Sequence, residues 1–230
     1  MSTEKFLPVE FCKGNNGLDK VVLRESRGSS AEVYLYGGHV TSWKNDHGEE
    51  LLFVSSKATF KPPKAIRGGI PICFPQFASL GSLESHGFAR NRFWSIDTDP
   101  PAFPTNSSSK AYIDLILRPS EEDLKIWPHS FEFRLRVALT PGGDLMLISR
   151  VRNTSTDGKP FSFTFAYHTY FSVSDISEVR VEGLETLDYL DNLQNKERFT
   201  EQGDAITFES EVSSGYHFSV CLHYLTLLFI

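Results

Sequence analysis

Alternating hydrophobic and polar positions recur along the middle of the chain. In FEFRLRVAL (131–139) every second residue is apolar, and charged residues fill three of the positions between them: Glu132, Arg134 and Arg136. AYIDLILR (111–118) alternates in the same way and groups three apolar residues: Ile113, Leu115 and Leu117. Successive side chains of a strand point to opposite faces, so this period of two predicts strands that cover a core with one face.

Turn and helix signals separate these segments. TPGGD (140–144) is rich in turn residues and leads into the strand-like DLMLISRVRN (144–153), which predicts a hairpin with 131–139. PSEEDLKIWP (119–128) is the segment with helical character, because Ser120 can cap it, acidic residues fill its first turn and Pro128 ends it. The chain therefore reads as all-β, a large antiparallel sandwich with almost no helix.

The last residues break this pattern. Residues 212–230 hold no Asp, Glu, Lys or Arg and end on the apolar run YLTLLFI. We expect 1–211 to form the sandwich domain and 212–230 to be an apolar tail of different character.

Charge and cysteine usage narrow the function. The formal net charge of −6 disfavours nucleic acid as a partner, so an anionic ligand would need a local cluster of arginines. The odd, widely spaced cysteines Cys12, Cys73 and Cys221 fit a reducing compartment and predict neither a metal site nor a cofactor. The N-terminus lacks the apolar core of a secretory signal, and no run approaches the roughly 20 apolar residues of a membrane span. We expect a cytoplasmic protein that does not engage membranes; the sequence leaves its oligomeric state open and favours a monomer.

His168 is the first candidate for chemistry. In FSFTFAYHTYF (161–171) aromatic residues occupy one face, and the other face is small and polar until His168 and Tyr170. That pattern suits the floor of a pocket beneath a core face. The alternative is a histidine whose ring is satisfied by hydrogen bonds on a half-buried sheet.

Arginines and a second histidine gather between residues 67 and 94. Arg67 precedes a diglycine, and His86-Gly87 is followed by Arg90 and Arg92. An arginine on a rigid loop beside glycine amides suits capture of a phosphate or carboxylate, although a structural arginine or a solvated surface loop is the alternative reading. Two histidines and two or three arginines, without paired metal ligands, indicate acid–base work on an anionic substrate.

Three ordered motifs carry a family resemblance. RGGIPICFPQF (67–77), SHGFARNRFW (85–94) and AYHTYF (166–171) resemble the hexose-6-phosphate mutarotases, the glucose-6-phosphate 1-epimerase branch of the aldose 1-epimerase superfamily. The resemblance runs from about residue 15 to about residue 211. It implies a galactose mutarotase-like β-supersandwich that interconverts the α and β anomers of a hexose 6-phosphate by ring opening and reclosure, without a cofactor.

The resemblance also implies roles for individual residues. His168 matches the general acid, and His86 matches a histidine that hydrogen-bonds the sugar. Arg67 and Arg90 match the arginines that hold the phosphate, and Ser85 occupies a position that often contacts substrate. Arg92 has no such backing and is expected to be structural. Which hexose is preferred stays open among glucose, galactose and mannose.

The resemblance stops inside a motif. Ser213 stands where the family has an Asp that binds sugar hydroxyls, and the strand that carries the family's catalytic Glu has no counterpart here. The sequence therefore predicts a sandwich that lacks its final strands and an epimerase activity impaired by the missing base. The alternatives are a non-catalytic domain that binds or senses sugar phosphates, and a truncated product that does not fold stably.

Overall fold

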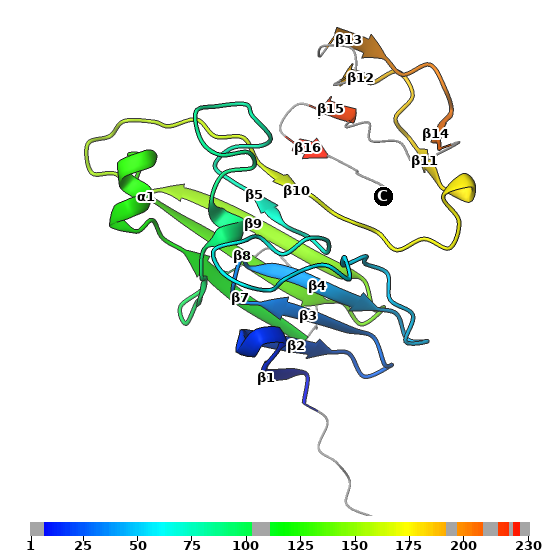
Figure 1. The fold of residues 1–230 in the computed structure, drawn as a ribbon, viewed down its shortest axis with the longest axis horizontal. Coiled ribbons are helices and arrows are strands. Elements are labelled where there is room, and N and C mark those ends of the chain that lie inside the picture. The colour runs from blue at the N-terminus through cyan, green and yellow to red at the C-terminus, as the bar shows by residue number, and fades with distance from the viewer. Residues whose placement is uncertain (1–6, 103–110, 192–196, 209–215, 221–222, 226–230) are drawn as a thin grey trace, which may run out of the picture.

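The structure is a computed structural model that describes residues 7–102, 111–191, 197–208, 216–220 and 223–225 (Figure 1). Strands dominate these residues, and their one α-helix, α1, spans Glu121–Ile126. Short 3-10 turns lie at three places: η1 (Asn15–Gly17), η2 (Ala89–Asn91) and η3 (Ile176–Glu178). The all-β class predicted from the sequence is confirmed.

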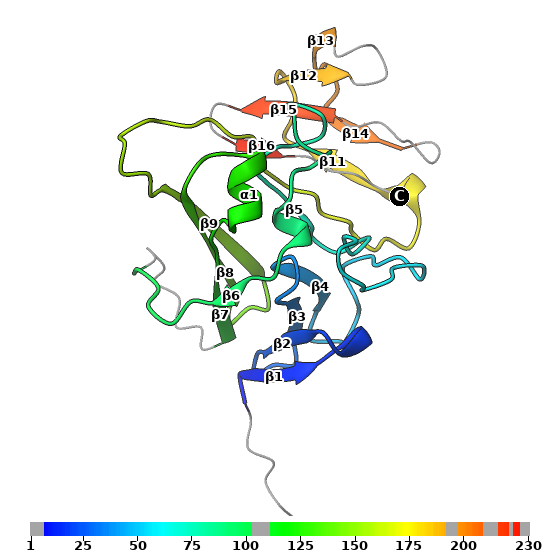
Figure 2. The same cartoon turned by 60° about the vertical axis from the view of Figure 1, so that its left-hand side comes forward.

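Two four-stranded antiparallel sheets form the main body. The first runs in the order β1-β2-β3-β4, with bounds Val9–Lys13, Asp19–Arg24, Ser30–Tyr34 and His39–Lys44. The second runs in the order β6-β7-β8-β9, with bounds Ser95–Ile96, Ala111–Leu117, Phe131–Leu139 and Leu145–Asn153. They lie face to face (Figure 2), and their inner residues form one buried cluster that includes Val21, Leu23, Val33, Leu115, Phe133 and Leu135. This packing is the predicted sandwich.

The predicted hairpin and helix are both present. β8 and β9 pair in register from Phe131↔Asn153 to Leu139↔Leu145, and the alternating apolar residues of β8 are all buried. The Ser120 hydroxyl accepts from the Asp123 backbone N–H, and the Asp123 carboxylate accepts from the Ser120 backbone N–H. This reciprocal capping box explains why so short a helix begins where it does.

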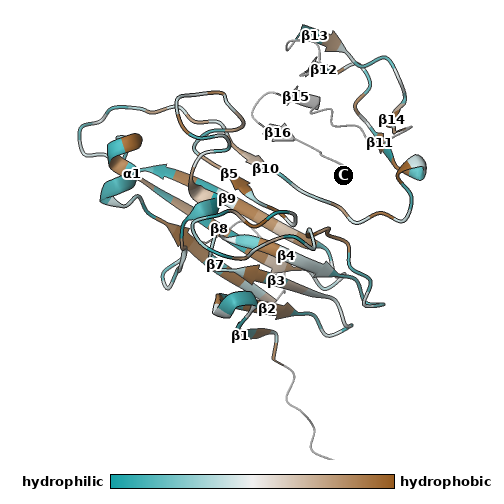
Figure 3. Ribbon diagram, in the orientation of Figure 1, coloured by the Kyte–Doolittle hydropathy of each residue, from teal (hydrophilic) through white to brown (hydrophobic). Residues whose placement is uncertain are grey.

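Hydropathy follows the same architecture. Hydrophobic residues concentrate on the strands of the two packed sheets, and hydrophilic residues gather on α1 and the loops (Figure 3). Among the residues that the structure describes, no helix combines the length and hydropathy needed to cross a bilayer.

The segment 161–171 differs from the prediction of one long alternating strand. Only β10 (Ala166–Tyr167) is a strand, and it pairs with β5 (Ile72–Cys73). The expected core face is incomplete, because Phe163 is 42% exposed, and the expected pocket face includes the fully buried Ala166. Residues 161–165 lie outside any ladder, so strand alternation does not govern which of their side chains are buried.

Beyond β10 the chain forms two small antiparallel sheets. β11 (Arg180–Glu182) pairs with β14 (Ala205–Thr207), and the other sheet has the order β13-β12-β15-β16, with bounds Glu197–Thr200, Asp188–Asp191, Tyr216–Val220 and His223–Leu225. Both views place these strands beyond the β5–β10 end of the sandwich (Figures 1 and 2). β15 and β16 fall within the predicted tail, whose boundary at residue 211 stays a prediction. Ser213 lies outside the described residues.

Candidate functional site

A tight diglycine turn presents Arg67. Gly68 and Gly69 have φ angles of +103° and +64°, where glycine is favoured, and a Cβ at either position would overlap a main-chain carbonyl oxygen of a neighbouring segment. The fully buried ring of His39 donates from Nε2 to the Gly68 carbonyl at 2.7 Å and so holds the turn in place. The Arg67 side chain is exposed, so a rigid, buried turn carries a free guanidinium.

A second strained turn orients His86. Both His86 and Gly87 have positive φ, +70° and +65°, and a Cβ on Gly87 would overlap the Phe74 carbonyl oxygen. The ring Nδ1 of His86 accepts from the Ala78 backbone N–H at 3.2 Å. An atom that accepts this bond carries no proton, so in the neutral ring the proton lies on Nε2.

His168 directly follows β10, and the pairing of β10 with β5 places it near His86. The backbone N–H of His168 donates to the Pro71 carbonyl at 3.0 Å. The ring centroids of His168 and His86 lie 5.2 Å apart, and that of Tyr170 lies 4.8 Å from His168.

His168 is buried, with 8% of the residue exposed, and neither ring nitrogen has a hydrogen-bond partner among the residues that the structure describes. Within that part of the chain, the ring is not satisfied by hydrogen bonds of the sheet. Burial, then the His86 ring and the Arg90 guanidinium, lower the pKa of His168 to about 4. Buried polar groups are nearly always paired, so an unpaired ring at this position suits a ligand.

A pocket of about 660 Å³ opens beside these rings and is strongly cationic. Its lining includes Tyr170 and Pro71, which adjoin His168, and four cationic side chains: Lys57, Lys64, Arg67 and Arg90. Arg90 is half-buried and donates from Nη2 to the Ser85 carbonyl at 2.8 Å, and its buried Nε has no partner within the described part of the chain. No carboxylate lines this pocket among the described residues. Its chemistry therefore favours an anion.

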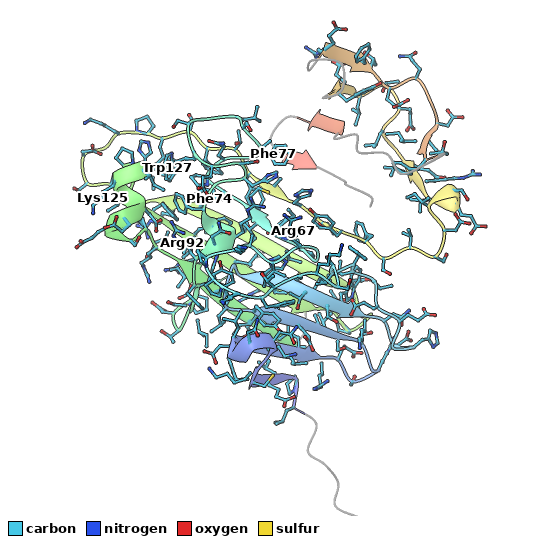
Figure 4. The ribbon with its side chains drawn as sticks, viewed as in Figure 1. Arg67, Phe74, Phe77, Arg92, Lys125 and Trp127 are labelled. Carbon is cyan, nitrogen blue, oxygen red and sulfur yellow. The ribbon has the colours of Figure 1, made fainter. Side chains whose placement is uncertain are left out.

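Arg92 does not line this pocket and has a structural role instead. Its Nε and Nη2 reach Asp123 Oδ1 at 2.8 and 2.7 Å, and its guanidinium lies 5.3 Å from the centre of the Phe88 ring. Figure 4 shows Arg92 toward α1 and Arg67 away from it, consistent with this separation of roles. Arg92 ties the loop to Asp123, the buried residue of the first turn of α1.

The structure thus gathers most of the residues that the sequence singled out. Arg67, Arg90 and Tyr170 line the pocket. The rings of His86 and His168 lie next to each other but do not line it. The Ser85 side chain is exposed, and it is the carbonyl that contacts Arg90. Sequence reasoning missed Lys57 and Lys64, although two lysines shortly before a predicted phosphate-binding arginine were a usable signal.

One further cluster includes a residue that sequence reasoning set aside. Cys73, His86 and His168 each offer a possible metal-ligand atom, and these atoms lie within 4.8 Å of one another.

Known proteins resemble this chain over most of its length. A protein of Cenchrus ciliaris described as a "putative glucose-6-phosphate 1-epimerase" is 77% identical over 207 residues, which cover 90% of this chain and 63% of that protein. A protein of Escherichia coli K12 with the same description is 36% identical over 185 residues, covering 79% of this chain and 58% of that protein. The chain therefore spans about three fifths of the length of these relatives.

Solved structures share the fold. A "putative mutarotase" of Salmonella typhimurium superposes with a TM-score of 0.71 at 28% identity, covering 94% of this chain and 68% of the other. A galactose 1-epimerase of Lactobacillus acidophilus superposes with a TM-score of 0.56 at 18% identity, covering 80% and 59%. These neighbours confirm the galactose mutarotase-like sandwich. The model of the aldose 1-epimerase family matches residues 19–229, and the chain belongs to that family.

Proposed function

We propose that the chain is a hexose-6-phosphate mutarotase, a glucose-6-phosphate 1-epimerase that interconverts α and β anomers. One observation supports this most strongly: in a member of an epimerase family, a pocket with four cationic side chains adjoins a buried His168 whose ring has no partner among the described residues. The cations suit a phosphate, and an imidazole beside them suits proton transfer at the sugar. The names of the relatives point to the same substrate.

The phosphate is bound by Arg67 and Arg90 in this proposal. Arg67 projects from a turn whose backbone is fixed by its neighbours, so anion binding has to order only the side chain and not the loop. Among the described residues the buried Nε of Arg90 has no partner, and a bound anion would supply one. Lys57 and Lys64 add positive charge at the same opening.

His168 acts as the general acid, and His86 donates a hydrogen bond to the sugar from Nε2. The acid must be protonated, yet burial, and to a smaller extent the His86 ring and the Arg90 guanidinium, lower the pKa of His168 to about 4. A bound phosphate carries nearly two negative charges at neutral pH and would offset that Arg90 charge. Since an anion stabilises the imidazolium form, substrate binding raises the pKa of His168 toward the working pH.

Anomer exchange also needs a base. No carboxylate lines the pocket among the described residues, and Glu209 and Glu211, the nearest candidates in sequence, lie outside them. We therefore expect this chain to bind hexose 6-phosphate and to exchange its anomers slowly. The lack of a carboxylate in the described lining of the pocket also favours the second candidate function, a sugar-phosphate-binding domain without catalysis.

Binding and exchange are tested separately. Calorimetry with glucose 6-phosphate and with glucose should show that Arg67→Ala weakens binding of the phosphorylated sugar far more than binding of glucose. Arg27→Ala is the matched control, because Arg27 is exposed and does not line the pocket. Equal losses for the two sugars in the Arg67 variant would refute the phosphate assignment.

Exchange is followed by saturation-transfer NMR of the two glucose 6-phosphate anomers. Binding with slow but measurable exchange supports an impaired epimerase, and binding with no exchange above the uncatalysed rate supports the binding domain. Failure to bind glucose 6-phosphate at all would refute both functions.

A further inference from the structure

Cys73, His86 and His168 bring one thiol and two imidazoles together inside the fold. Cys73 is fully buried on β5, and His168 follows β10, the strand paired with β5. The Sγ atom of Cys73 lies 3.3 Å from Nδ1 of His86, and the rings of His86 and His168 are 5.2 Å apart. The proposed sugar chemistry uses the two histidines but gives the thiol no role.

The hydrogen bonds determine which of these atoms carry protons. Nδ1 of His86 accepts from the Ala78 N–H, so it has no proton of its own. In the contact between Cys73 and His86 the thiol is therefore the donor, and its proton lies between Sγ and Nδ1. His168 adds two ring nitrogens without a partner among the described residues, and in the neutral ring one of them offers a lone pair.

The spacing approaches that of a tetrahedral zinc site. Zn–S and Zn–N bonds of about 2.3 and 2.0–2.1 Å at a tetrahedral angle put sulfur and nitrogen ligands roughly 3.6 Å apart and two nitrogen ligands roughly 3.3 Å apart. The observed Sγ–Nδ1 distance of 3.3 Å is already close to the first value. The three ligand atoms all lie within 4.8 Å of one another. Side-chain shifts of roughly 1–1.5 Å would therefore bring them to the ligand–ligand distances of a tetrahedral zinc site.

We propose that Cys73, His86 and His168 form a binding site for Zn²⁺ or a similar thiophilic divalent cation. On binding, the Cys73 S–H bond breaks, the sulfur forms a bond to the metal, and the proton is released to the solvent. Nδ1 of His86 transfers its lone pair from the Ala78 N–H to the metal, and one nitrogen of His168 supplies the third bond. A water molecule takes the fourth position, as in zinc sites with three protein ligands.

Charge and coordination limit the affinity. The metal and one thiolate leave a net charge of +1 near the Arg90 guanidinium, which repels it. The site also has three protein ligands rather than four. We expect dissociation constants in the micromolar range, weaker than those of structural zinc sites.

The site is tested by Co²⁺ titration of a Cys12→Ser/Cys221→Ser variant, in which Cys73 is the sole thiol. The expected result is a thiolate-to-Co²⁺ charge-transfer band in the near ultraviolet, with the visible bands of tetrahedral Co²⁺, both abolished by adding Zn²⁺. Cys73→Ser should abolish the charge-transfer band, and His168→Asn should weaken binding at least tenfold. His47→Asn, which changes an exposed histidine, should leave both unchanged.

Absence of the charge-transfer band, or a band that survives His86→Asn and His168→Asn at full affinity, would overturn the proposal. If the ligand variants fail to fold, alkylation of Cys73 in the otherwise unchanged protein decides instead: Zn²⁺ should slow it and a chelator should restore its rate, and an unaltered rate would equally refute the site. These measurements do not depend on the proposed epimerase activity. Inhibition of anomer exchange by Zn²⁺ is a further consequence that rests on that activity.

Discussion

His39 should make the stability of the protein depend on pH between 7 and 5. Its ring is fully buried beneath the diglycine turn and donates from Nε2 to Gly68, and no described residue pairs with its buried Nδ1. Burial is the main cause that lowers the pKa of His39 to about 4 from its ordinary 6.5. Protonation would place a charge and a second N–H at a fully buried position where the described residues offer Nδ1 no acceptor.

The sign and size follow from proton linkage. Because the folded-state pKa lies below the unfolded value, the unfolded chain binds more protons between pH 6.5 and 4, and stability falls as the pH falls through that range. With those two pKa values, the His39 contribution at pH 5 is lower than at pH 7 by about 2 kcal/mol. The His39 contribution to stability is fully present above the unfolded-state pKa of 6.5 and fully lost below the folded-state pKa of about 4.

Urea unfolding at pH 7 and pH 5, followed by tryptophan fluorescence, measures this loss. His39→Gln keeps an N–H donor for Gly68 but cannot titrate, so its loss of stability between the two pH values should be smaller than the parent's by about 2 kcal/mol. His86 and His168 titrate in both proteins and cancel in the comparison. His47→Gln, an exposed control, should behave like the parent. An equal loss in His39→Gln and parent would show that His39 is not the group responsible.

Three further predictions test the site and its scaffold. In a chain extended to the full length of its relatives, His168→Asn should slow anomer exchange by roughly 10²–10⁴-fold in the NMR assay, and a near-normal rate would assign the proton to another residue. Gly87→Ala should lower the unfolding free energy by about 2 kcal/mol or more, because strain at positive φ adds to overlap with a main-chain carbonyl. Gly158 has a similar φ, but a Cβ there would have nothing within 4 Å. If Gly158→Ala lowers the unfolding free energy in urea as much as Gly87→Ala does, the overlap at Gly87 does not matter. Arg136 donates two hydrogen bonds to the carboxylate of Asp114, a residue that is 6% exposed. Arg136→Met removes both, so it should lower the unfolding free energy by about 3–5 kcal/mol. A loss of under about 1 kcal/mol in the same urea assay would contradict this.

The hairpin and the helix could be predicted because their information is local. Strand alternation in 131–139 sets which residues face the core, and the β8–β9 register follows from the turn between the strands. The capping residues of α1 lie within four positions of one another, Ser120 to Asp123. The short motifs around Arg67, His86 and His168 likewise identified the family and part of the candidate site, but not its lysines Lys57 and Lys64.

Only the tertiary structure decided how those residues meet. Strand alternation failed in 161–165, because an alternating pattern does not reveal whether a partner strand is present. Cys73 and His168 are far apart in sequence, and the pairing of β5 with β10 brings them together. Burial by surrounding segments then removes water from His168 and lowers its pKa, an effect of three-dimensional surroundings that its sequence neighbours do not encode. The sequence determined which chemical groups are available, and packing determined their protonation and their partners.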